Sequence, residues 1–106
     1  MIKFSNAENC AITRCLEYWI SNWDCECPTL FGLRLSDFSN IAKDWPDSYV
    51  KNQEIALLAC LDSFRELLYG ASALPQNRIK EQIGLSYKES SELANRISKE
   101  YEKFEL

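Results

Sequence analysis

The sequence predicts an all-α fold, with about five helices in a compact orthogonal bundle around one central buried helix, as a single domain over residues 1–106. Apolar residues recur at spacings of three and four, the period of a helix with one buried face. No segment alternates apolar and polar residues as a half-buried strand does. With three glycines and three prolines in 106 residues, linkers and low-complexity tails are not expected.

The first predicted helix spans residues 6–22. Ser5 and Glu8 have the spacing of a capping box, in which each side chain accepts a hydrogen bond from the backbone N–H of the other residue. Apolar residues then follow at the spacing of one helix face: Ile12, Cys15, Leu16, Trp19, Ile20 and Trp23. Because Trp19 and Trp23 share this face with aliphatic residues, we expect both rings to pack in the core.

Residues 24–35 are predicted to form a structured loop. Pro28 and Gly32 lie in this segment, and the apolar spacing of the first helix is lost. Its apolar side chains are still expected to pack inward: Leu30, Phe31, Leu33 and Leu35.

A short helix beginning at Ser36 is expected to end before Pro46, since proline disfavours helical geometry at the preceding residue. The longest predicted helix spans residues 49–69, with Asp47 or Ser48 as its N-cap. Its apolar arc is wide enough to place it at the centre of the bundle. That arc consists of Val50, Ala56, Leu57, Leu58, Cys60, Leu61, Phe64, Leu67 and Leu68.

The last two predicted helices form a hairpin. Gly70 ends the central helix, and a short helix spans residues 75–83 before Gly84. Ser86 and Glu89 form a second capping box, which begins the final helix. The inner face of that helix should carry Leu93, Ala94, Ile97, Tyr101 and Phe104.

Composition argues against several function classes. Residues 1–10 hold one lysine and then polar residues where a signal peptide needs an apolar run of about 7–15 residues, so we expect a cytoplasmic protein without a membrane role. Twelve basic and sixteen acidic residues give a net charge of −4. This balance disfavours a nucleic-acid ligand and favours a basic protein partner.

The chain contains no histidine, which removes the usual general base and the commonest zinc ligand. Glycine-rich phosphate loops are also missing from the sequence. We therefore predict neither catalytic residues, nor a cofactor, nor a metal site, and we do not expect an enzyme.

Five cysteines are an odd number, and free thiols are expected in a cytoplasmic protein. Cys25 and Cys27 before Pro28 weakly suggest a metal or redox element, but zinc sites pair a C-x(2–4)-C motif with a second pair of ligands. Cys10 and Cys15 have the wrong spacing to complete such a site. Inert thiols are the simpler interpretation, and a redox or metal role for Cys25 and Cys27 stays open.

Acidic and aromatic residues in the second quarter of the chain and on the central helix could form a docking surface. Carboxylates would steer a cationic partner, and Trp45 and Tyr49 would anchor it. The predicted partner-binding residues are Asp37, Asp44, Trp45, Asp47, Tyr49, Asp62 and Glu66. Glu17, Asp24 and Glu26 form a second acidic region. The alternative interpretation is a solvated helix face.

The segment IGLSYKESSELANRI, residues 83–97, matches the sequence pattern of the turn in a helix-turn-helix. If residues 78–97 bound DNA, the first helical turns after Ser86 would face the bases. These turns carry two acidic residues, Glu89 and Glu92, and one basic residue, Lys88. A DNA-binding protein needs several lysine or arginine side chains in contact with phosphates to bind at physiological salt. A helix-turn-helix regulator therefore remains an alternative, as does another cytosolic adaptor.

Residues 64–89, FRELLYGASALPQNRIKEQIGLSYKE, resemble the C-terminal part of small bacterial immunity proteins from contact-dependent growth inhibition systems. The matching features are a helix ending in L-L-Y-G, a loop ending in Ala-Leu-Pro, a short helix and an I-G-L-S turn. The resemblance implies a cytoplasmic antitoxin that forms a 1:1 complex with the toxin domain encoded beside it. Many such toxins are nucleases, including RNases, and an acidic protein could cover their basic active cleft.

Overall fold

Every regular element among residues 1–105, the part of the chain that the computed structural model describes, is a helix. The predicted all-α class is confirmed, but residues 1–105 form seven helices where about five were expected. They are α1 (Asn6–Ser21), α2 (Cys27–Phe31), α3 (Leu35–Lys43), α4 (Asp47–Lys51), α5 (Gln53–Tyr69), α6 (Gln76–Ile83) and α7 (Tyr87–Glu102).

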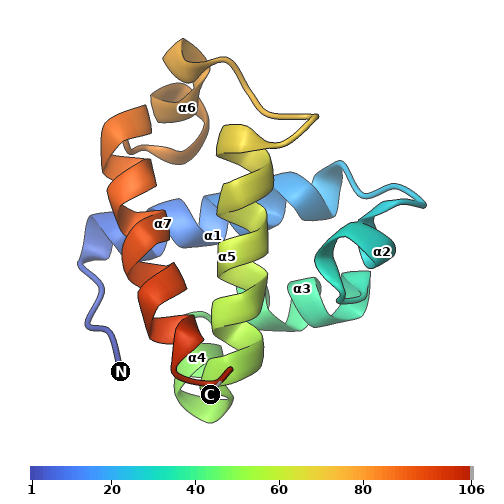
Figure 1. Cartoon of the computed structure of the whole chain (residues 1–106), viewed down its shortest axis with the longest axis vertical. Helices are drawn as coiled ribbons and strands as arrows, with labels where there is room; N and C mark the ends of the chain where they lie inside the picture. The colour runs from blue at the N-terminus through green and yellow to red at the C-terminus, as the bar shows by residue number, and fades with distance from the viewer. Residues whose placement is uncertain (106) are drawn as a thin grey trace.

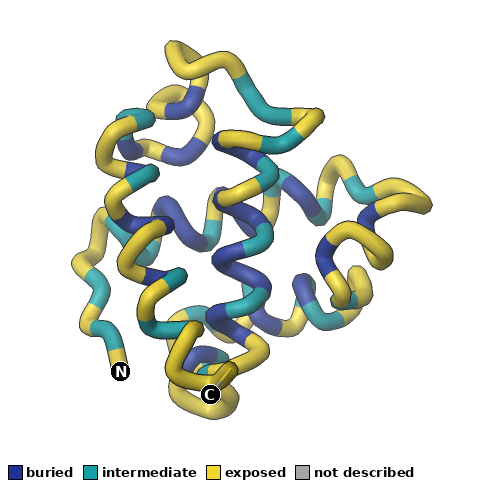
Figure 2. Tube along the Cα trace, viewed as in Figure 1, coloured by how far each residue is buried: buried dark blue, intermediate teal, exposed yellow. Residues whose placement is uncertain are grey.

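The central helix is α5, which packs against α1, α2, α3, α4 and α7. In Figure 1, α5 and α7 lie side by side and run in opposite directions, and α1 crosses them. Figure 2 shows that buried positions follow most of α5. The apolar residues on the arc predicted for this helix, from Ala56 to Leu68, are mostly buried in one core shared with α1, α6 and α7.

Both predicted capping boxes are present. At the start of α1, Ser5 Oγ accepts from Glu8 N (3.1 Å) and Glu8 Oε1 accepts from Ser5 N (2.8 Å). At the start of α7, Ser86 and Glu89 make the same pair of hydrogen bonds at 3.1 and 3.0 Å. Gly84 ends α6 with a left-handed φ of +88°, a conformation that favours glycine because it lacks a Cβ atom. The capped hairpin of the sequence prediction is confirmed.

The predicted helix over residues 49–69 is interrupted, which is the first correction. Asn52 ends α4 with an extended backbone (φ −149°, ψ 89°), and its side chain caps α5 by accepting from Ile55 N at 3.3 Å. Asparagine is a favoured N-cap residue, because its carboxamide oxygen accepts a hydrogen bond from a nearby backbone N–H. The break turns Val50 outward, so that 61% of it is exposed instead of buried on the central stripe.

The predicted loop over residues 24–35 contains α2, which is the second correction. Pro28 lies in its first turn and Gly32 ends it with a left-handed φ of +70°. Phe31 is buried as expected, but Leu30 and Leu35 are exposed. At the other end of the chain, the side chain of Phe104 is also exposed, because the backbone leaves the helix after Glu102.

None of the helices in residues 1–105 is both long enough and apolar enough to cross a bilayer.

Candidate partner-binding surface

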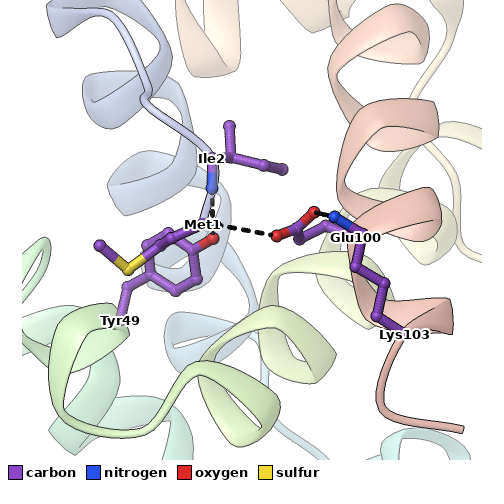
Figure 3. Close-up of polar contacts among 5 residues, drawn as sticks. All are labelled: Met1, Ile2, Tyr49, Glu100 and Lys103. Carbon is purple, nitrogen blue, oxygen red and sulfur yellow. Dashed lines mark hydrogen bonds and ion pairs between the residues drawn. The ribbon is translucent and has the colours of Figure 1, made fainter.

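Tyr49 was predicted to anchor a partner, and the structure contradicts this. Its side chain is only 2% exposed, and its hydroxyl oxygen accepts a hydrogen bond from Ile2 N at 2.8 Å. Figure 3 shows the N-terminal segment passing over Tyr49, with the amino group of Met1 3.3 Å from Glu100 on α7. Tyr49 therefore holds this segment against the bundle and has no free face for a partner.

Trp45 is half-buried and takes part in the same packing. Its ring stacks on Tyr49, with centroids 5.7 Å apart and an interplanar angle of 11°. Its Nε1 donates to Asn9 Oδ1 on α1 at 2.9 Å. The stacking holds Trp45 against α4 and the hydrogen bond joins it to α1, so much of this side chain is occupied within the fold.

The three aspartates around α3 and α4 differ in what they contact. Asp37 is half-buried and caps α3, because its Oδ2 accepts from Arg34 N at 2.9 Å. Asp44 is exposed and lies 4.0 Å from Lys51 Nζ. Asp47 is exposed in the first turn of α4. Asp44 and Asp47 are accessible to a partner, whereas Asp37 mainly stabilises its own helix.

Asp62 and Glu66 lie one turn apart on α5 and are both half-buried. Burial raises the pKa of Asp62 to about 7, Arg65 opposes this rise and Glu66 adds to it. The Oδ2 atom of Asp62 is shielded from solvent and has no hydrogen-bond partner among residues 1–105. The Glu66 side chain lies over Gly70, where an added Cβ would come within 1.9 Å of Oε1.

The predicted site residues thus form two groups. Asp44 and Asp47 lie around α4, and Asp62 and Glu66 lie farther along α5; none of the ion pairs described for residues 1–105 joins the two groups. In the second acidic region, Glu17, Asp24 and Glu26 are exposed. Asp24 Oδ1 accepts from the backbone N–H of Glu26 at 2.9 Å, so it also organises the start of α2.

Apolar residues next to Asp62 and Glu66 were missing from the sequence prediction. Ile55 and Tyr69 are 40% and 54% exposed, and Leu58 is half-buried. They fall at helical spacings from the two carboxylates, a signal that the sequence contains. The spacing alone does not tell which apolar side chains of this helix stay exposed, because that depends on how the neighbouring helices pack.

The cysteines do not gather into one cluster. Cys10 and Cys25 are exposed, Cys15, Cys27 and Cys60 are buried, and all five are free thiols. Burial raises the pKa of the Cys15 and Cys60 thiols, so both stay protonated at neutral pH. No group of three potential metal ligands was found among residues 1–105.

Two shallow hollows lie along α1, away from the acidic residues of α5. The larger, about 430 Å³, lies between α1 and Gln82 of α6, and the smaller, about 330 Å³, extends to Trp45 and Pro46. Arg14 and Glu17 line both. Neither hollow includes Asp62, the carboxyl group with the most strongly raised pKa among the acidic residues.

The hairpin of α6 and α7 has the connectivity of a helix-turn-helix, but α7 is fixed along α5. Tyr69 Oη donates to Ser91 Oγ at 2.8 Å, and Arg65 Nη2 donates to Ser98 Oγ at 3.1 Å. Ser90, where an aliphatic residue is usual, is fully buried. The capping hydrogen bonds from Ser86 lower the pKa of Glu89, so a carboxylate stays ionised at the end of α7 that would face DNA.

No protein-family model, curated protein or solved structure matches this chain.

Proposed function

We propose that this protein is an immunity protein, which binds a cognate toxin domain of a contact-dependent growth inhibition system and covers its active site. The toxin would be a nuclease, such as an RNase, with a basic cleft. The proposal rests on the resemblance of residues 64–89 and on the distribution of charge over the fold. The resemblance is the reason for naming the toxin system. The negative charge is the reason for expecting a surface that binds a basic nuclease cleft.

One observation carries the proposal furthest: the excess negative charge comes from the segment between the end of α1 and the last turns of α5. Residues 17–66 contain nine acidic and four basic side chains, whereas residues 67–105 contain six of each. In Figure 1, α2 and α3 lie on the opposite side of α5 from α6 and α7, and α4 lies at the lower end of α5. An acidic surface of this kind would attract a basic cleft and raise the rate of association.

Mixing the purified protein with the toxin domain encoded beside it is expected to give a 1:1 complex and to abolish nuclease activity. Light scattering after gel filtration measures the stoichiometry, and cleavage of RNA measures the activity. Because carboxylates would steer association, the on-rate should fall several-fold between about 50 and about 300 mM salt, with a smaller change in the off-rate. Full toxin activity in a molar excess of this protein would refute the proposal.

The helix-turn-helix regulator is the alternative that the α6–α7 hairpin favours, and DNA binding separates it from the immunity protein. We expect no gel shift with fragments of the source genome at ~150 mM salt, since the exposed start of α7 carries too few basic groups for phosphate contacts. A sequence-specific shift under these conditions would favour the regulator. Substituting Lys88 with alanine would then be the control, because loss of a phosphate contact weakens all sequences alike.

A further inference from the structure

The solvent-facing side of α5 carries a stripe in which apolar residues enclose two carboxylates. It consists of Ile55, Leu58, Asp62, Glu66 and Tyr69, which we call the α5 stripe. Spacings of three and four residues place these side chains on one face of the helix. Its two apolar ends are its most exposed members, 40% at Ile55 and 54% at Tyr69. A central helix that is mostly buried thus leaves one mixed apolar and acidic face open.

Asp62 occupies the middle of this stripe and lacks a hydrogen bond to its shielded oxygen. Arg65 could have supplied a cation, but its guanidinium donates to Ser98 Oγ on α7 at 3.1 Å. Glu66 adds negative charge from the next turn of α5. On α7, the charge of Asp62 contributes to the raised pKa of the Tyr101 phenol. No ion pair to Asp62 occurs among residues 1–105. Leaving a shielded carboxylate oxygen unpaired costs free energy.

We infer that the α5 stripe docks a segment of the toxin domain that presents one lysine or arginine between apolar side chains, and that this cation pairs with the carboxyl group of Asp62. The inference rests on the proposed function and deepens it by naming the contact. A cation beside this carboxyl group neutralises the negative charge of Asp62 and Glu66. Apolar contacts with Ile55, Leu58 and Tyr69 exclude water from the ion pair, which strengthens it.

Binding of a cation to Asp62 also makes the affinity depend on pH in a known direction. The pKa of Asp62 in the free protein is about 7, so its carboxyl group is mostly protonated at pH 6 and mostly ionised at pH 8. Besides burial, Glu66 raises the pKa of Asp62 and Arg65 lowers it; from α7, Tyr101 has its own pKa raised in part by the charge of Asp62. Because the cation binds the ionised form, affinity should rise about tenfold from about pH 6 to about pH 8.

The test uses calorimetry with the full chain and the purified toxin domain encoded beside it. Asp62→Asn should weaken binding about 30-fold or more and remove the pH dependence, since it deprives a desolvated cation of its partner. The matched control is Glu92→Gln, which removes an exposed carboxylate on α7 outside the stripe, and for which we expect a change below about threefold. Ile55→Ala should weaken binding more than Val50→Ala, its exposed apolar counterpart on α4.

The outcomes separate this inference from the proposed function. If the wild-type chain forms no complex, the proposed function fails. If it forms the complex and Asp62→Asn and Ile55→Ala bind like wild type, the α5 stripe is not the contact, while the proposed function stands. Circular dichroism of each variant confirms that weaker binding does not come from unfolding.

Discussion

Replacing Phe64 with alanine is expected to lower the free energy of unfolding by about 3–5 kcal/mol, the usual cost of removing a large aromatic ring from a core. Phe64 is fully buried near the middle of α5, the helix that contacts five of the other six. Its removal leaves a cavity that rigid neighbours fill only partly. Since domains of this size are stable by about 5–15 kcal/mol, much of the total would be lost. Urea unfolding followed by far-UV circular dichroism measures the change.

Val50→Ala is the control for this measurement. It also truncates an apolar side chain, but Val50 is 61% exposed on α4, so the change should stay within about 0.5 kcal/mol. A loss below about 1 kcal/mol for Phe64→Ala would contradict the central position of α5. A loss for Val50→Ala as large as that for Phe64→Ala would contradict the break at Asn52.

The position of Phe64 illustrates what the sequence could predict about the fold. Helical periodicity depends on neighbours three and four residues away, so the sequence contains it directly. The broad apolar arc of α5 therefore predicted both its central place and its buried residues. The capping boxes at Ser5 and Ser86 are equally local, and both were predicted correctly.

The two short helices show where local reasoning was insufficient. Asn52 interrupts an apolar pattern without a glycine or proline, and an asparagine inside such a pattern could equally face solvent on an unbroken helix. For α2, Pro28 in the first turn and Gly32 at the end are the usual marks of a helix. They were interpreted as loop residues because five residues are too few to establish a period.

The candidate surface was the harder part, because exposure depends on contacts between distant residues. Sequence identified the acidic side chains but could not show that the segment containing Ile2 covers Tyr49, 47 residues away. It likewise could not show that α7 lies along α5 or that one carboxylate oxygen of Asp62 is shielded from solvent. The sequence thus shows which side chains are charged, whereas only the tertiary structure shows which of them are buried.

Asp62→Asn is expected to stabilise the free protein at neutral and higher pH. Burial raises the pKa of Asp62 from 3.8 to about 7, so the folded state holds this proton more tightly than the unfolded state does. The free energy of unfolding that Asp62 contributes therefore falls as pH rises from about 4 to about 7. The whole shift corresponds to about 4 kcal/mol for an enclosed group. Solvent around this half-buried side chain reduces the expected effect to about 1–2 kcal/mol.

The difference between variant and wild type isolates this effect. Hydrogen bonds from Lys103 and Met1 lower the pKa of Glu100, and groups of that kind lose stabilising energy as pH falls instead. They are present in both proteins and cancel in the difference. Urea unfolding of wild type and Asp62→Asn should thus give nearly equal stabilities at about pH 4 and a variant advantage that grows to about pH 7. A wild-type advantage at about pH 8 would show that the carboxylate of Asp62 stabilises the fold.

A carboxylate that destabilises the free fold and yet strengthens a complex is the pattern of a residue kept for function. The same substitution should therefore raise the stability of the free protein and weaken binding to the proposed toxin partner. An acidic residue that belongs only to a solvated surface would change neither property, and one that supports the fold would lower stability. Measuring both properties on Asp62→Asn, with Glu92→Gln beside it, distinguishes these three roles of a single side chain.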